Sequence, residues 1–246
     1  MESKNLKIYH TTDLHNRRKA FSRLKDIDKK SENILIVDSG DAILGSSTIF
    51  ISRESILDDM KKYGYDAIAV GNREFHYLRK IFKERIEQVD IPFISANLLD
   101  IDGENFVKPF IIKEFEGLRI GITGITPIQY SKKSFLKKLS NFEFLDYKEA
   151  LENVFKKIEK TVDLIIVLSH IELKITEALA RQLEPSIVFL GGHDHRVMFN
   201  PVKVKNSWLF YSGCYGSHIT KINLKFYFGA GGNKFEIENS EVIEIN

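Results

Sequence analysis

Seven residues of types that commonly bind metal ions follow short apolar runs of the sequence. They are two aspartates, one asparagine and four of the seven histidines: Asp13, His15, Asp41, Asn72, His170, His193 and His195. A single D-x-H or H-x-H pair is short enough to occur by chance, and a lone Asp after a strand usually has a role in a turn. Seven such residues in equivalent positions after successive apolar runs favour a metal site over these structural roles.

The residue types narrow the metal and its chemistry. Imidazole, carboxylate and amide oxygen without a thiolate suit Mn, Fe, Zn, Ni or Co better than a structural zinc site. Seven ligands are too many for one four-coordinate ion, so we expect two divalent ions. Paired ions about 3.5–4 Å apart serve phosphoryl and related hydrolyses, in which a metal-bound hydroxide attacks. Asp41, alone in its glycine-flanked loop, is expected to bridge the two ions.

The apolar runs themselves are continuous and rich in Ile, Val and Phe, which is typical of strands buried on both faces. They are residues 6–10, 33–38, 66–71, 92–97, 118–125, 164–170 and 186–192. Stretches with helical spacing lie between many of them, at 18–30, 52–63, 77–88 and 147–161. This alternation predicts an α/β fold with largely parallel strands, whose carboxyl ends would gather the seven residues in one crevice.

The last part of the chain has a different pattern. Segments 207–213, 217–228 and 234–245 alternate polar and apolar residues and are joined by Gly-rich turns, including 229–233. This pattern predicts antiparallel strands and a hairpin. The chain has no internal repeat and no linker rich in Pro, Ser or Gly. We therefore expect residues 1–246 to form a single domain, with no second substrate-binding domain.

Composition argues against several classes of partner. A net charge of +2 gives little support for a nucleic-acid or membrane partner, and the single cysteine, Cys214, excludes an intramolecular disulfide framework. The N-terminus lacks the apolar segment of a secretory signal. No run approaches the roughly 18 apolar residues that a membrane helix needs. We therefore expect a cytoplasmic protein, and the sequence leaves its oligomeric state open.

Several motifs resemble those of a known family. DLH, GD, GN-x-E, SH and GHDH, in this order, resemble the calcineurin-like metallophosphoesterases. The blocks HTTDLH, GNREF, SANLLD, RIGITGITP and GGHDH are similar to the catalytic domain of bacterial 5′-nucleotidases. The resemblance covers nearly all of residues 6–226. It implies a four-layer sandwich of two mixed β-sheets flanked by helices, with the site at the sheet edges.

The resemblance also implies how the seven residues divide between two ions. One ion would be held by Asp13, His15 and His195. The other would be held by Asn72, His170 and His193, with Asp41 between them. Separately from the resemblance, we expect Asn72 and Arg73 to help hold the phosphoryl oxygens of the substrate. The resemblance does not extend to the second domain that grips the base in those nucleotidases, so their nucleoside specificity does not carry over.

Arg73 departs from the family pattern. The family usually has histidine there, which is thought to stabilise the transition state or protonate the leaving oxygen, and it has aspartate at the position of His76. Arginine stays protonated and cannot be a general acid, but it binds phosphate well. Arg73 can therefore act as a phosphate clamp, or His76 can supply the proton, or the site binds metal with little turnover. The second option needs a helix from about residue 74 that puts both residues on one face. A solvated histidine in the first helical turn is the plainer interpretation of His76.

Together these features predict a dinuclear metal-dependent phosphoesterase that hydrolyses a small phosphate ester or phosphoanhydride, with nucleotides among the candidates. One alternative is a phosphodiesterase or nuclease on the same ions, which would need a basic groove with exposed aromatic residues. The other is a metal-binding scaffold without catalysis, because Arg73 replaces the usual catalytic histidine.

Overall fold

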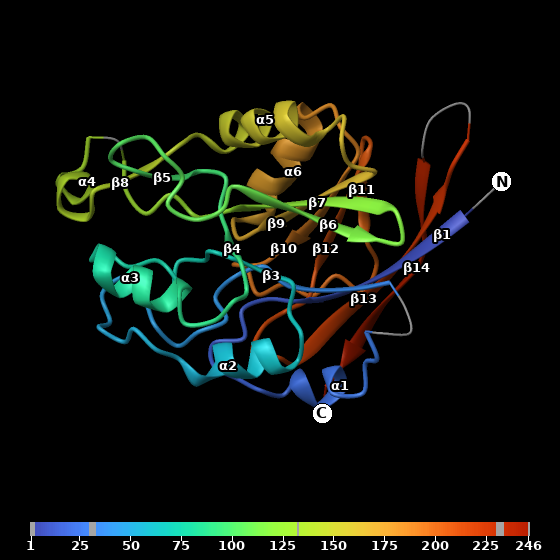
Figure 1. Cartoon of the computed structure of the whole chain (residues 1–246), viewed down its shortest axis with the longest axis horizontal. Coiled ribbons are helices and arrows are strands. Elements are labelled where there is room, and N and C mark those ends of the chain that lie inside the picture. The colour runs from blue at the N-terminus through green and yellow to red at the C-terminus, as the bar shows by residue number, and fades with distance from the viewer. Residues whose placement is uncertain (1–2, 30–32, 132, 230–233, 246) are drawn as a thin grey trace.

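Two six-stranded β-sheets lie face to face, with helices on their outer sides (Figure 1). The computed structural model describes residues 3–29, 33–131, 133–229 and 234–245. The predicted α/β class, two mixed sheets flanked by helices, is confirmed. The predicted turn at 229–233 falls mostly on residues 230–233, which lie outside the described residues.

The first sheet has the strand order β14-β13-β1-β2-β3-β4. Its parallel strands are β1 (Ser3–Thr11), β2 (Ile34–Asp38), β3 (Ala67–Ala69) and β4 (Phe93–Ile94). Its antiparallel strands are β13 (His218–Tyr227) and β14 (Lys234–Glu244). The predicted C-terminal hairpin is thus β13 and β14, and it joins this sheet through β1.

The second sheet has the order β11-β12-β10-β9-β7-β6. Its strands are β6 (Phe110–Phe115), β7 (Leu118–Ile125), β9 (Leu164–Ser169), β10 (Ile187–Gly191), β11 (Val202–Val204) and β12 (Ser207–Tyr211). The sequence pattern predicts an antiparallel segment at 207–213, but β12 runs parallel to β10. The short β11 is the reason, because it pairs antiparallel with β12 and so turns the chain back into the direction of β10. A separate small sheet consists of β5 (Leu98–Asp100) and β8 (Phe142–Phe144).

Helices cover the outer face of each large sheet. On the side of the first sheet lie α1 (Phe21–Leu24), α2 (Ser55–Lys62) and α3 (Arg79–Ile86), and on the side of the second lie α5 (Tyr147–Ile158) and α6 (Leu173–Gln182) (Figure 1). The remaining helix is α4 (Phe135–Ser140). The predicted helix at 18–30 is only the one turn of α1, and the helix predicted from residue 77 begins at Arg79.

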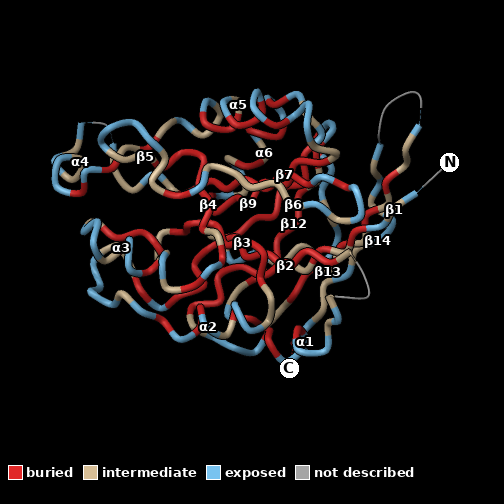
Figure 2. Tube along the Cα trace, viewed as in Figure 1, coloured by how far each residue is buried: buried red, intermediate tan, exposed pale blue. Residues whose placement is uncertain are grey.

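Buried side chains form a layer between the two sheets and a layer outside each of them (Figure 2). Between the sheets, Leu6 and Leu35 belong to one apolar cluster with Ile120 and Ile166. Each sheet is therefore buried on both faces, which explains the continuous apolar runs. Within the described ranges, no helix is long and apolar enough to cross a membrane.

Candidate metal centre

The seven predicted ligands follow strands of both large sheets, at the carboxyl ends. The first sheet delivers Asp13 and His15 after β1, Asp41 after β2 and Asn72 after β3, whereas the second delivers His170 after β9 and both His193 and His195 after β10. Hydrogen bonds join the two groups of loops. His170 Nδ1 lies 2.7 Å from the carbonyl of Ser39, and the backbone N–H of His193 donates to Asp13 Oδ2 at 2.9 Å.

Two overlapping groups of these side chains have the geometry of a metal site. In the first group, Asp13 Oδ1 lies 3.6 Å from His15 Nε2 and 3.4 Å from His195 Nε2. In the second, His170 Nε2 lies 3.9 Å from Asp13 Oδ1 and 3.3 Å from Asp41 Oδ1. Asp13 belongs to both groups, whereas Asp41, the predicted bridge, belongs only to the second.

The other two predicted ligands lie at the edge of these groups. The ring of His193 is centred 5.3 Å from that of His170. Asn72 is joined to the centre through its neighbour, because the backbone N–H of Arg73 donates to Asp41 Oδ1 at 2.8 Å. The structure thus gathers all seven residues at one junction.

Buried polar atoms without partners indicate that these residues fit a metal. Among the described residues, buried atoms with no hydrogen-bond partner include Asp13 Oδ1, His15 Nε2, Asn72 Oδ1 and His170 Nε2. Native proteins rarely leave buried polar groups unpaired, because desolvation costs about 1–3 kcal/mol for each. Since the four atoms are of the types that divalent transition metals accept, a bound cation would satisfy them.

The backbone at the site adopts an uncommon conformation. Five predicted ligands have φ between +47° and +72°: Asp13, His15, Asp41, His193 and His195. Non-glycine residues rarely occupy this left-handed region, and such strain concentrates at functional sites. Gly71 is needed beside them, because a Cβ atom there would lie 2.3 Å from Asp41 Oδ1.

Glu74 fixes the loops that carry Asp41 and Asn72. Its buried carboxylate accepts hydrogen bonds from the backbone N–H groups of Asp41, Ala42 and Gly71, each at 2.9 Å. Glu74 is the last residue of the GN-x-E motif, and no role was predicted for it. Its position three residues after Gly71 was the available signal.

Charges at the site are strongly coupled. Burial alone would raise the pKa of Asp41, but His170 and nearby hydrogen bonds outweigh it and hold the pKa at about 2. Burial alone would lower the pKa of His170, whereas the carboxylates of Asp41 and Asp13 raise it to about 10. Without metal the pair is therefore ionised, and the proton on His170 has to leave before Nε2 can bind a cation.

Arg73 lies beside the candidate ligands. Its Nε is 3.7 Å from Asp41 Oδ2, and its Nη1 donates to the carbonyl of Leu44 at 3.0 Å. The Nη2 donors have no partner among the described residues, so they are available to an anion. This position suits a phosphate clamp.

The environment of His76 fits neither predicted role, the proton donor beside Arg73 or the solvated histidine of a first helical turn. Helix α3 begins only at Arg79, so Arg73 and His76 do not share a helical face. The solvated histidine is also wrong, because His76 is only 1% exposed. Its Nδ1 accepts a hydrogen bond from the backbone of Leu78 at 2.9 Å, and its ring contacts that of Phe50. Burial, aided by Arg85, lowers the pKa of His76 and favours the neutral ring.

Like Glu74, Tyr215 lies at the site although no role was predicted for it from the sequence. Its ring is centred 5.2 Å from that of His15 and 5.4 Å from that of His195. Its backbone N–H donates to the carbonyl of Asp13 at 2.7 Å, and its φ is +57°. The motif around Cys214 gave no chemical signal for this contact.

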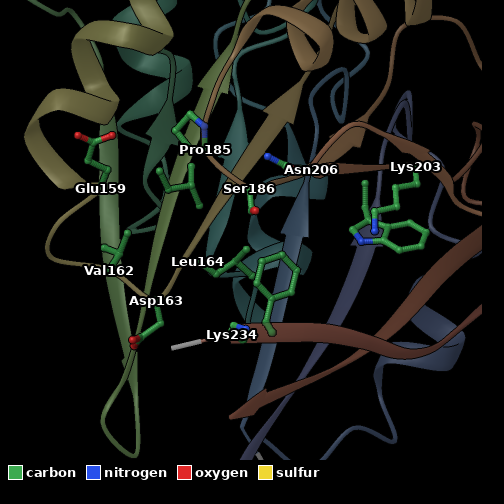
Figure 3. A pocket seen from close by; sticks show the side chains of 12 residues that line it. Glu159, Val162, Asp163, Leu164, Pro185, Ser186, Lys203, Asn206 and Lys234 are labelled. Atoms are coloured by element: carbon green, nitrogen blue, oxygen red, sulfur yellow. The ribbon is translucent and has the colours of Figure 1, made fainter. Parts of the chain in front are cut away.

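A hollow of about 400 Å³ lies at the other ends of the strands (Figure 3). It is lined by residues at the starts of β9, β10 and β12, including Leu164, Ser186 and Trp208, and its described lining contains none of the predicted site residues. Asp163 in this hollow already accepts a hydrogen bond from the backbone of Arg119. The hollow therefore lies at the opposite ends of these strands from the metal centre.

Sequence comparison identifies the family. Residues 6–197 match the calcineurin-like phosphoesterase family, so this chain belongs to that family. A 5′-nucleotidase of Vibrio cholerae is 29% identical over 185 residues, which cover 67% of this chain and 33% of the relative. A 5′-nucleotidase of Rattus norvegicus is 26% identical over 226 residues, which cover 79% and 38% respectively. The matched part of the chain therefore spans only 33% and 38% of the length of these relatives.

Solved structures agree on the fold. The calcineurin-like phosphoesterase YfkN of Bacillus subtilis superposes with a TM-score of 0.80 at 21% identity, covering 99% of this chain and 92% of that one. The NAD nucleotidase of Haemophilus influenzae gives a TM-score of 0.81 at 20% identity, covering 100% and 51%. The predicted family is confirmed, and the predicted class of phosphate-ester hydrolase agrees with the names of these relatives.

Proposed function

We propose that this chain is a metal-dependent phosphoesterase that uses two divalent ions to hydrolyse a small phosphate ester or phosphoanhydride, with a nucleotide as the leading candidate. The observation that carries the proposal is the set of four buried, unpartnered ligand atoms where the two sheets meet. Family membership and the 5′-nucleotidases among the relatives support the same reaction class.

The proposed ligands divide as the family resemblance implies. Asp13, His15 and His195 serve one ion, Asn72, His170 and His193 serve the other, and Asp41 lies between them. Divalent ions in such a centre supply Lewis acidity, which activates water and neutralises phosphoryl charge. We propose that each ion is Mn, Fe, Zn, Ni or Co. We also propose that residues 1–246 form a single domain and that the protein is cytoplasmic.

Residues of the chain orient the substrate. The free guanidinium donors of Arg73 bind two phosphoryl oxygens, and their fixed positive charge stabilises the charge on the transferring group. Arg73 cannot protonate a leaving group, and His76 is buried with a lowered pKa. Because general acid catalysis is typically worth about 10²–10⁴-fold, leaving groups that need little protonation are hydrolysed best.

The test compares an aryl phosphate with a nucleoside monophosphate on manganese-loaded protein, with Asp41→Asn as the control. We expect turnover of the aryl ester to exceed that of the alkyl ester by about 10²-fold or more, and to disappear in the control. Similar rates on both esters would contradict the absence of a general acid. Two bound ions without turnover on either ester would favour a scaffold, and cleavage of single-stranded DNA or RNA would favour a nuclease.

Arg73→Ala separates the clamp from the ions. We expect this variant to keep its metal content and to lose about 10²-fold in kcat/KM, because it removes the phosphate contact and leaves all seven predicted metal ligands in place. Unchanged KM and kcat would sink the clamp.

A further inference from the structure

The chain that follows Asp41 is an irregular loop with a fixed backbone. Residues 42–54 are all described and form neither helix nor strand. The fully buried Arg85 holds this loop against the segment after β3. Its guanidinium donates to backbone carbonyls from both, those of Ser46, Ile49, Ile51, Arg73 and Phe75, at 2.7–3.1 Å. One side chain thus makes the two loops a single unit.

This unit presents large apolar side chains to solvent. Leu44 is 48% exposed, Ile49 43%, Phe50 73% and Leu78 41%. We name these four residues the apolar platform. Large exposed apolar side chains commonly mark a binding surface. Here the segments that carry them are tied together by Arg85 and by His76, so the backbone beneath them is already ordered.

Phe50 has a rigid support. Its ring is centred 5.4 Å from that of the buried His76, at an interplanar angle of 61°. The hydrogen bond from the Leu78 backbone to Nδ1 fixes the His76 ring, so the platform residues before and after it share one anchor. His76 thereby acts as a positioning residue for Phe50.

The platform is continuous with the metal centre through Arg73. The Arg73 guanidinium lies beside Asp41 at one end, and it donates to the carbonyl of Leu44, a platform residue, at 3.0 Å. The Arg85 guanidinium donates both to the backbone carbonyl of Arg73 and to that of Ile49, another platform residue. A phosphate held by Arg73 therefore lies beside the loop that carries Leu44.

We infer that the apolar platform binds the nucleobase of a nucleotide whose phosphate is held by Arg73. The inference rests on the proposed function and specifies its substrate class. A base is planar and apolar on its faces, so it stacks on an aromatic ring such as Phe50 whatever its sequence of donors and acceptors. The 5′-nucleotidases among the relatives act on substrates of this class by name.

The test measures binding without turnover. AMP and ribose 5-phosphate, which share a phosphate ester and differ in the base, are titrated into chelator-treated protein and followed by ligand-observed NMR. We expect AMP to bind about tenfold more tightly, with saturation transferred to its base protons, as base stacking on an aromatic ring generally provides. Phe50→Ala should remove both effects. Phe135→Ala, which changes a 74% exposed phenylalanine on α4, should retain them.

Each other outcome contradicts a defined part of the inference. Equal affinities for AMP and ribose 5-phosphate in the wild type, or a base preference that survives in Phe50→Ala, would overturn the platform as a base site. A concentration-dependent dimer that Phe50→Ala dissolves, without any base preference, would assign the platform to a second copy of the chain. Intact base-dependent binding with no hydrolysis of any nucleotide would instead reject the proposed function and keep the base site.

Discussion

Two buried histidines show how differently the protein treats one residue type. His10 and His170 are both 0% exposed, and both contact Ser39. His10 Nε2 lies 2.8 Å from the Ser39 hydroxyl, whereas His170 Nδ1 lies 2.7 Å from the Ser39 carbonyl. Only Ser39 therefore lies between the buried ring of His10 and that of His170 at the metal centre.

The second ring nitrogen makes the difference. His10 Nδ1 meets the hydroxyl of Ser212 at 2.7 Å, and burial lowers the pKa of His10 to about 3 although Asp13 opposes this. His170 Nε2 faces the Asp41 carboxylate at 3.3 Å without hydrogen-bond geometry, and its pKa rises to about 10 despite burial. Burial of a polar group is thus no sign of function by itself. What marks the metal centre is that several buried ligand atoms without hydrogen-bond partners lie together there.

Buried charged groups follow the same division. Asp38 accepts hydrogen bonds from the Thr11 hydroxyl at 2.6 Å and the Gly40 backbone at 2.9 Å, whereas Asp13 keeps one oxygen unpaired. Arg85 is the largest satisfied group, with carbonyl partners from two loops. Buried side chains with hydrogen-bond partners should therefore affect the stability of the protein, whereas those without partners should affect metal binding.

Arg85→Met should have the largest effect on folding. It leaves at least five backbone carbonyls without their donor, so we expect the free energy of unfolding to fall by about 3–5 kcal/mol. Urea denaturation measures this. Arg79→Met, which removes an exposed arginine of the same helix paired with Asp100, is the control and should change little. Equal midpoints for the two variants would refute the anchoring role of Arg85.

Metal should stabilise the protein, because a cation satisfies atoms that are unpaired in its absence. At about 100–1,000 times the dissociation constant, manganese should add about 3–4 kcal/mol to the free energy of unfolding, and a chelator should remove it. Asp41→Asn should show a much smaller gain. A gain of the same size in this variant would mean that the ions bind elsewhere.

Glu74→Gln tests the support beneath the ligands. The amide can accept from only part of the N–H groups that the carboxylate now binds, so the loops of Asp41 and Asn72 should loosen. We expect metal affinity to fall by about 10–100-fold in calorimetric titrations. Glu84→Gln, on the surface of α3, is the matched control. Parallel losses in both variants would argue against the role of Glu74.

His10 should give the smallest effect, one that depends on pH. The folded protein keeps His10 neutral down to a pKa of about 3, but the unfolded chain binds a proton below about pH 6.5. Falling pH therefore favours unfolding, and metal-free protein should lose about 1.4 kcal/mol per pH unit below 6.5 through this residue. His10→Asn should have a correspondingly flatter profile between pH 7.5 and 5.5. Parallel profiles would show that His10 already titrates normally.

Much of the fold and site could be predicted because their signals are local. A strand buried on both faces reads as a continuous apolar run, and the polar residue just after it reveals a strand end. All seven candidate ligands were found in this way, and the helical spacing over 147–161 identified α5. The direction of β12 was missed, because it depends on pairing with β10 rather than on its own pattern.

The sequence by itself thus determined the α/β class, the family and the residues that could bind metal, since each depends on residue type and short spacing. Only the tertiary structure decided that Asp13 joins both ligand groups, that Glu74 ties two loops and that His76 lies beneath Phe50. Several of these contacts link residues far apart in the chain; Glu74 and Ala42, for example, are separated by 32 positions. Loop closure of this length leaves no periodicity in a sequence, and its partners are chosen by the packing of two sheets.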